Sequence, residues 1–211
     1  MTRFSKFYSA VYVTVLLAPA FSTPSQAQME SPDVVVRSAA ADVLESMEGR
    51  REYLEAHPDE LRQLVNNTFL PRFDRSYAAY LVLARHGRAA TADQRSRFSE
   101  ALYQYILNRY AHGLLSFTSD RLQILPFEEE EGQEKATVRT FVVLNYGSRI
   151  PVNYDLRLGD AGWRVYDIAI DGISYLRNLR SQLGEEIERS GLESVITRLI
   201  ADGARVEDDA A

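Results

Sequence analysis

Few residues in this sequence combine the type and spacing that chemistry at a site requires. Asp167 and Asp171 lie four positions apart and could serve as paired acids in a hydrolysis, although the same spacing suits a turn. His57, His86 and His112 lack the i, i+4 spacing of a metal pair on a helix. The chain has no cysteine, which excludes zinc thiolates, disulfides and a Cys nucleophile. We therefore expect no catalytic residues, no metal site and no cofactor.

The composition is that of an ordinary globular domain. The 211 residues are 45% hydrophobic and 26% charged. The formal charge is -6, from 24 basic and 30 acidic residues. An acidic chain whose sequence shows no basic cluster is a poor candidate for a nucleic-acid partner.

The first 27 residues have the pattern of an export signal. Arg3 and Lys6 precede an apolar stretch at 10–18, and small residues stand at 25–27. An uncleaved anchor is the alternative, but Pro19 ends the apolar run well short of the roughly 20 residues that span a membrane. We expect a signal peptide at 1–27 that is cleaved near Ala27, a domain at 28–203 and a polar tail at 204–211. An exported chain without cysteines fits a bacterial envelope.

Helix signals frame both ends of this domain. Ser31-Pro32-Asp33 predicts a capped helix start, and a second helix from Pro58 is broken at Pro71. Thr91 and Gln94 form the pattern of a capping box. Further helices are predicted at 76–86, 92–117, 174–189 and 192–202.

Between these helices the period of the apolar residues changes from 3.6 to 2. Four strands separated by short turns predict an antiparallel meander, and hence an α+β domain with a four-stranded sheet surrounded by helices. The predicted strands are 121–127, 135–144, 150–158 and 163–170.

The strands offer apolar residues on both faces. Phe141 and Val143 alternate with Val142 and Leu144. Such a sheet must be covered on both faces or must line a cavity. Periodicity alone does not separate a solid core from a hollow one.

Several motifs resemble one family. They are Phe69-Leu-Pro-Arg-Phe-Asp74, 94–98, Gly162-Trp-Arg-Val-Tyr-Asp167 with its continuation to Ser174, 178–183 and 191–199. In order and spacing they are similar to the MlaC-like, toluene-tolerance family of periplasmic phospholipid-binding proteins. The similarity spans roughly residues 32–202. One departure is Ala84, which stands where the family usually has Gly.

The resemblance implies a function that the pattern alone does not. It implies a monomeric periplasmic carrier, with a bound phospholipid as cargo and an apolar pocket enclosed by the twisted sheet and helices. Its expected partners are an inner-membrane ABC transporter with its lipid-binding subunit and an outer-membrane lipoprotein–porin complex. This activity would maintain the lipid asymmetry of the outer membrane.

Three groups of site residues follow. We expect Val165 and Ile168 to lie on opposite faces of their strand, so that at least one is ordinary core. The candidates for the pocket lining are Tyr105, Ile106, Val138, Val142, Tyr154, Leu156, Val165 and Ile168. The candidates for a gate are Tyr77, Tyr80 and Leu81. The residues expected to be structural are Asp167, Asp171, Asn178 and Arg180, with Arg180 reaching a carboxylate across the strand–helix junction and Ser174 capping the helix.

Two other functions compete with the carrier. A hydrolase would use Asp167 and Asp171, but the sequence supplies neither a nucleophile nor a metal site for it. An envelope adaptor would bind only proteins and would have a solid core. The two rivals differ from the carrier in whether a lipid occupies the interior.

Overall fold

The computed structural model describes residues 30–118, 121–128, 132–144 and 147–204. The expected export segment at 1–27 and all but the first residue of the expected tail at 204–211 lie outside this part of the chain. Within the described residues no helix is both long and apolar enough to cross a membrane.

Seven α-helices and three short 3₁₀ helices form the helical part of the described chain. The capping box of Thr91 and Gln94 is present, because each side chain pairs with the backbone of the other residue. Ser31 precedes the first helix but does not cap it; its hydroxyl donates to Asp33 instead. The helices are α1 (Pro32–Met47), α2 (Arg51–Ala56), α3 (Pro58–Phe69), η1 (Leu70–Arg72), α4 (Arg75–Leu83), η2 (Ala84–Arg88), α5 (Ala92–Tyr110), η3 (Ala111–Ser116), α6 (Tyr175–Ser190) and α7 (Leu192–Ala204).

Three helical segments differ from the sequence prediction. The short helix α2 was not predicted, because six residues carry too little periodicity to show. The long helix stops at Tyr110 and tightens into η3. The helix expected at 76–86 ends at Leu83, where Ala84 leaves the helical conformation with φ 45° and ψ −119°.

The sheet is an antiparallel meander in the order β1-β2-β3-β4-β5. The prediction of four strands was one short, because the two-residue strand β5 adds to the edge of β4 after a tight turn. The strands are β1 (Leu122–Ile124), β2 (Lys135–Val143), β3 (Arg149–Gly159), β4 (Gly162–Ile170) and β5 (Ile173–Ser174).

A bulge in β4 changes which side chains share a face. Asp155 pairs with Asp167, but the next residue of β3, Leu156, pairs with Val165. Tyr166 is therefore an extra residue on β4, and the alternation of side chains shifts by one there. Val165 and Ile168 consequently lie on the same face, so the expectation that they lie on opposite faces was wrong.

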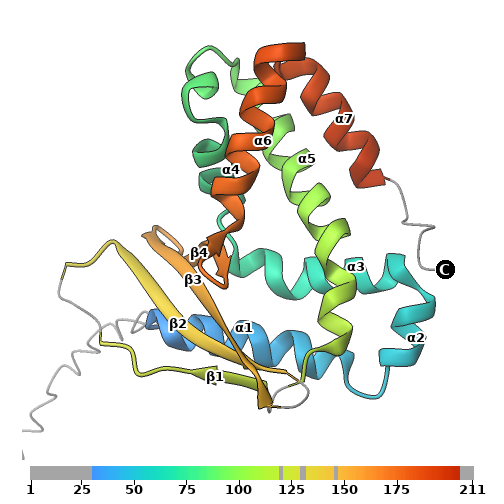
Figure 1. Ribbon diagram of the computed structural model, residues 1–211, viewed down its shortest axis with the longest axis vertical. Helices are drawn as coiled ribbons and strands as arrows, with labels where there is room; N and C mark the ends of the chain where they lie inside the picture. Colours follow the sequence, from blue (N-terminus) through green and yellow to red (C-terminus); the bar gives the residue numbers. More distant parts are fainter. Residues whose placement is uncertain (1–29, 119–120, 129–131, 145–146, 205–211) are drawn as a thin grey trace, which may run out of the picture.

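One face of the sheet packs on the helical core, and α4 contacts the other face near the β3–β4 turn. The inner face joins α1, α3, α5, α6 and α7 in a continuous hydrophobic core. Figure 1 shows α1 lying along the sheet, with α5, α6 and α7 rising beside it. The outer face carries Lys135, Thr137, Arg139 and Phe141 on β2, of which the first three are exposed and Phe141 is partly accessible. Tyr77 of α4 reaches this face, where the centre of its ring lies 5.7 Å from Lys135 Nζ and 4.4 Å from the guanidinium of Arg157.

Candidate functional site

The inner face of the sheet carries both sealed and accessible side chains. Thr140 and Val152, which pair with each other toward the β2–β3 turn, are 1% and 6% exposed. Near the β3–β4 turn, the paired residues Ala136, Leu156 and Val165 are buried in the core. Toward the β2–β3 turn, the same face carries apolar residues that keep solvent-accessible surface. We call these residues the open half of the inner face: Leu122, Ile124, Val142, Ile150, Tyr154, Ile168 and Ile170.

Tyr154 is a member of this open half that protein surrounds closely. Burial by the surrounding protein raises the pKa of its hydroxyl to about 12. The residue nevertheless keeps accessible surface and packs at the margin of the core beside its cross-strand neighbour Ile168. A partly accessible apolar side chain at the margin of the core is a position at which an apolar ligand can make contact.

Helices contribute further half-buried apolar side chains to the margin of the same core. Tyr105 and Ile106 on α5 are of this kind. Other members come from α1, η3 and the segment after β1, and they are Leu44, Leu114, Leu115 and Phe127. Apolar surface costs roughly 25 cal/mol per Å² to leave in water, so a margin of this composition suits an apolar ligand.

The residues predicted to line a pocket fall into two sets. Val138, Leu156 and Val165 are at most 1% exposed and belong to the solid core. The others keep accessible surface, and they are Tyr105, Ile106, Val142, Tyr154 and Ile168.

Sequence reasoning missed other members of the open half. Leu122, Ile124, Ile150 and Ile170 lie on the same face as the residues that were named. Alternation along each strand was the signal that could have found them.

The predicted gate residues lie on α4, which is anchored at its start. The ring of Tyr77 stacks edge-on against Tyr166 of β4 at 5.1 Å, and the guanidinium of Arg157 lies 4.4 Å from the centre of the same ring. Asp74 caps the helix by accepting from the backbone N–H of Tyr77 at 3.0 Å. The beginning of α4 is therefore fixed to the sheet.

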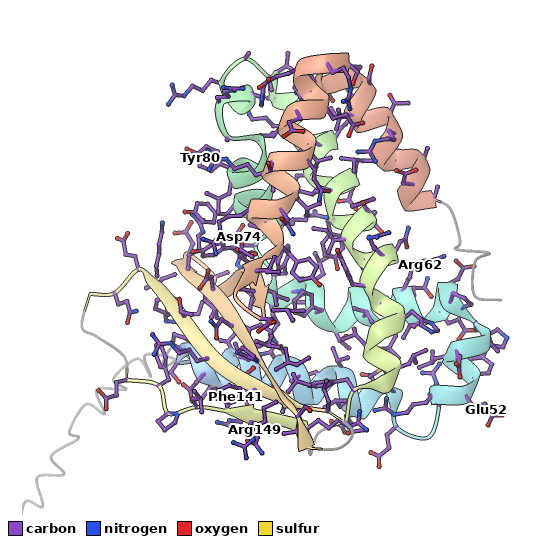
Figure 2. The ribbon with its side chains drawn as sticks, in the orientation of Figure 1. Glu52, Arg62, Asp74, Tyr80, Phe141 and Arg149 are labelled. Atoms are coloured by element: carbon purple, nitrogen blue, oxygen red, sulfur yellow. The ribbon has the colours of Figure 1, made fainter. Side chains whose placement is uncertain are left out.

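The end of α4 combines buried and exposed side chains. Val82 and Leu83 are each 1% exposed and Leu81 packs against the core, whereas Tyr80 is 63% exposed. Grooves of about 550 and 470 Å³ separate α4 and η2 from α5 and α6. Ala84, which follows the last residue of α4 and begins η2, has a positive φ, a backbone conformation that favours glycine. Figure 2 shows Tyr80 pointing away from the molecule while Asp74 lies at the centre, beside the sheet.

Asp167 is the polar centre of the junction between β4 and α6. It is 7% exposed, and its Oδ1 accepts from the backbone N–H groups of Ile168 at 2.8 Å and Leu176 at 3.1 Å. Its Oδ2 accepts from the hydroxyl of Ser174, which in turn caps α6 by accepting from the N–H of Arg177 at 3.1 Å. The prediction that Ser174 caps the helix is confirmed. Desolvation by burial raises the pKa of Asp167, although the three hydrogen bonds oppose this shift.

The other residues expected to be structural are exposed. Asp171 and Gly172 form the turn before β5 with positive φ values of 50° and 78°. Asn178 and Arg180 lie on the solvent side of α6. Arg180 lines the groove beside η2, and the expected ion pair with a carboxylate across the junction is not formed with any described residue.

The described residues also offer no cluster of three or more His, Asp or Glu side chains that could hold a metal ion. The two acids considered for hydrolysis differ in setting. Asp167 is buried with both oxygens accepting hydrogen bonds, whereas Asp171 is exposed in a turn.

The fold is shared with a solved structure. The structure matches that of a phospholipid-binding protein from Ralstonia solanacearum, solved at 1.53 Å in complex with a phospholipid. The TM-score is 0.75 at 23% sequence identity, and the match covers 84% of this chain and 99% of the other. The two chains therefore share a fold.

Sequence comparison gives the family. The family described as MlaC protein matches residues 37–201. The chain is 24% identical over 190 residues to the intermembrane phospholipid transport system binding protein MlaC of Haemophilus influenzae, covering 89% of each chain. It is 23% identical over 163 residues to the toluene tolerance protein ttg2D of Pseudomonas putida, covering 77% of this chain and 75% of the relative. The protein belongs to the MlaC family, as the sequence motifs indicated.

Proposed function

We propose that this protein is a phospholipid carrier whose acyl-chain site is an apolar concavity over the open half of the inner face. The observation that supports this proposal is the set of apolar side chains on the inner face that keep accessible surface beside sealed neighbours. Leu156 and Val165 are sealed, while Tyr154, Ile168 and Val142 keep accessible surface. The relatives named for phospholipid binding and transport support the same cargo.

The energetics of lipid transfer suit a carrier without chemistry. Two acyl chains contain roughly 30 methylenes, and exposing them to water would cost on the order of 24 kcal/mol at about 0.8 kcal/mol each. Transfer from a bilayer to an apolar concavity avoids this cost. Loading and unloading then need little net free energy, and direction comes from the partners.

We favour the carrier over a hydrolase because of the state of the two acids. Asp167 is engaged by three donors, and its neighbour Ser174 is engaged as a helix cap. Asp171 is exposed on the other side of the turn. We accordingly propose no enzymatic activity, no metal and no cofactor, with phospholipid as cargo.

The cellular setting is also a proposal. The pattern at 1–27 suggests export, which would leave a periplasmic domain at 28–203 and a polar tail. We infer that the carrier acts as a monomer between an inner-membrane ABC transporter with its lipid-binding subunit and an outer-membrane lipoprotein–porin complex. Such a route would help to maintain the lipid asymmetry of the outer membrane.

Native mass spectrometry of the protein purified from cells tests the cargo directly. We expect an added mass of about 700 Da that organic extraction identifies as phospholipid, as a drug-sized or larger ligand held in an apolar site would give. A bare protein mass under gentle ionisation would favour the adaptor with a solid core. Release of fatty acid from added phospholipid by the wild-type protein would favour the hydrolase.

A pair of charge substitutions tests where the acyl chains of the lipid bind. Val142→Asp places a carboxylate in the open half, where it can keep water, so the fold should survive while the lipid no longer co-purifies. Val138→Asp places the same charge in the sealed core at 0% exposure, where an unpaired carboxylate costs several kcal/mol, and this variant should not fold. If Val142→Asp folds and retains its lipid, the acyl chains lie elsewhere.

A further inference from the structure

The outer face of the sheet carries a row of three cations near the β3–β4 turn. The strand register places Lys135 opposite Arg157, and Arg157 opposite Arg164. Like charges directly opposite on neighbouring strands destabilise a sheet. Among the described residues, Asp74 is the acid that pairs with this row, through Arg157 Nε at 2.7 Å. Two positive charges therefore remain without an acidic partner in the described chain.

Glycines leave open space beside this row. The next positions on the same face of β3 and β4 are Gly159 and Gly162, which pair with each other and have no side chains. A methyl group built on Gly159 would lie 3.8 Å from Nη2 of Arg157 and 3.8 Å from Nη2 of Arg164. The two guanidinium groups therefore approach a shared space that any other residue at position 159 would occupy.

Arg164 is unusual for a cation at a surface. Its Nε is buried and has no hydrogen-bond acceptor within the described structure. Leaving a charged donor desolvated and unpaired is unfavourable. An anion that approaches the outer nitrogens of the same guanidinium would offset part of this cost.

The acids near the row do not neutralise it. Glu134 and Asp160 flank it in sequence, are exposed, and make no ion pair with it among the described residues. Asp155 lies two residues before Arg157, on the same face of β3, and accepts from the hydroxyl of Thr137 at 2.6 Å. Arg157 is paired with Asp74, and Lys135 Nζ lies 5.7 Å from the centre of the Tyr77 ring. The charges of Lys135 and Arg164 thus stay available to a ligand from solution.

We propose that Lys135, Arg157 and Arg164 form a binding site for a phosphate group, either that of a lipid at a bilayer surface or a free phosphate ion. The planar guanidinium group matches two oxygens of a phosphate, and lysine adds a point charge. The glycine floor lets the anion approach the backbone closely. This inference does not rest on the proposed function, because the row lies on the face of the sheet opposite to the apolar concavity.

Calorimetric titration of the full chain with sodium phosphate at fixed ionic strength tests the site. We expect saturable binding that Arg164→Gln and Lys135→Gln each weaken about fivefold. Gly159→Val should weaken binding similarly without any change of charge, by filling the shared space. Arg139→Gln is the matched control, because Arg139 lies on the same face of β2 but outside the row, and this variant should bind phosphate as the wild type does.

Sedimentation with phosphatidylglycerol vesicles in phosphate-free buffer shows whether the ligand is a lipid headgroup or a free phosphate ion. Vesicle binding that is lost in the same three variants assigns the site to a lipid headgroup. Saturable binding of dissolved phosphate without vesicle binding assigns it to the free ion. The proposal is overturned if neither ligand binds the wild type, or if Arg139→Gln weakens binding as much as the row variants do. The lipid mass in native spectra of Arg164→Gln should stay at its wild-type value, which keeps this test separate from that of the carrier.

Discussion

The carboxylate of Asp74 joins helix α4 to the sheet through Arg157. One oxygen accepts from the first turn of α4, and the other accepts from Arg157 Nε at 2.7 Å. The backbone N–H of Asp74 also donates to the carbonyl of Val165 at 2.7 Å. Asp74 is 5% exposed, so solvent screens these contacts only weakly.

Asp74→Ala should therefore lower the free energy of unfolding by about 2 kcal/mol. About 1 kcal/mol is expected from the lost cap, and the remainder from the lost charged hydrogen bond, discounted because Arg157 is partly exposed. Urea denaturation measures the change. Asp59→Ala is the control, since Asp59 is an exposed acid whose ion pair within the described residues is with nearby Arg62, and its effect should stay within about 0.5 kcal/mol. Equal effects of the two substitutions would show that Asp74 does not anchor the helix.

Ala84→Gly should stabilise the protein. Ala84 has φ 45° and ψ −119°, a conformation that costs a residue with a Cβ about 1–3 kcal/mol. Glycine removes this strain but adds about 0.4–1 kcal/mol of unfolded-state entropy. The expected net gain of about 1 kcal/mol corresponds to a rise of roughly 2–4 °C in Tm for a domain of this size.

The matched control is Ala89→Gly at the end of η2. Ala89 has an ordinary φ of −86°, so glycine relieves no strain there and should lower Tm slightly. If Ala84→Gly lowers Tm as well, the backbone at position 84 is not strained.

Much of the architecture could be predicted from local patterns, and the exceptions have physical reasons. Thr91 with Gln94 and the alternation in β2 are signals carried by neighbouring residues. The bulge at Tyr166 leaves no such signal in the sequence. A strand with one extra residue cannot be told from a strand with regular alternation until its partner strand is known. One unseen bulge reversed the predicted relationship of Val165 and Ile168.

The row of three basic residues on the outer face of the sheet also could not be predicted from the sequence. Lys135, Arg157 and Arg164 are scattered over thirty positions of an acidic sequence and form no run. Only the strand register places them in one row.

The pocket candidates were similarly ambiguous, because alternation gives the face of a side chain but not the distance from that face to the covering helix. The sealed Val138 and the accessible Val142 have the same pattern in sequence.

Asp167 should make stability depend on pH. Burial raises its pKa in the folded state, so its contribution to stability is fully present below the unfolded value near 4 and is lost as pH rises through the folded pKa. Asp167→Asn retains an acceptor for the two N–H groups and removes the titration. The Tm of the wild type relative to Asp167→Asn should therefore fall from about pH 3 to pH 7.

Asp167→Ala provides the comparison for the hydrogen bonds. It leaves the N–H groups of Ile168 and Leu176 without their acceptor, so it should lose about 1–3 kcal/mol for each buried group at every pH. A difference between wild type and Asp167→Asn that stays constant with pH would contradict a raised pKa for Asp167.

The final prediction concerns the element that moves when acyl chains enter or leave the site. The start of α4 is held by Asp74 and Tyr77. The end of α4 buries Val82 and Leu83 but carries the exposed Tyr80 and runs into the strained Ala84. We expect the moving segment to be residues 80–88, pivoting about the fixed start of the helix.

Amide hydrogen exchange with and without bound phospholipid tests this gate. Amides at 80–88 should exchange faster in the lipid-free protein, while those at 75–78 and at 98–107 of α5 should stay protected in both forms, because Asp74 anchors the first and the core holds the second. Ala84→Gly serves as the internal comparison, since relief of the strain should slow exchange at 80–88 without affecting α5. Equal protection of 80–88 and 98–107 in both forms would mean that the site opens at another element.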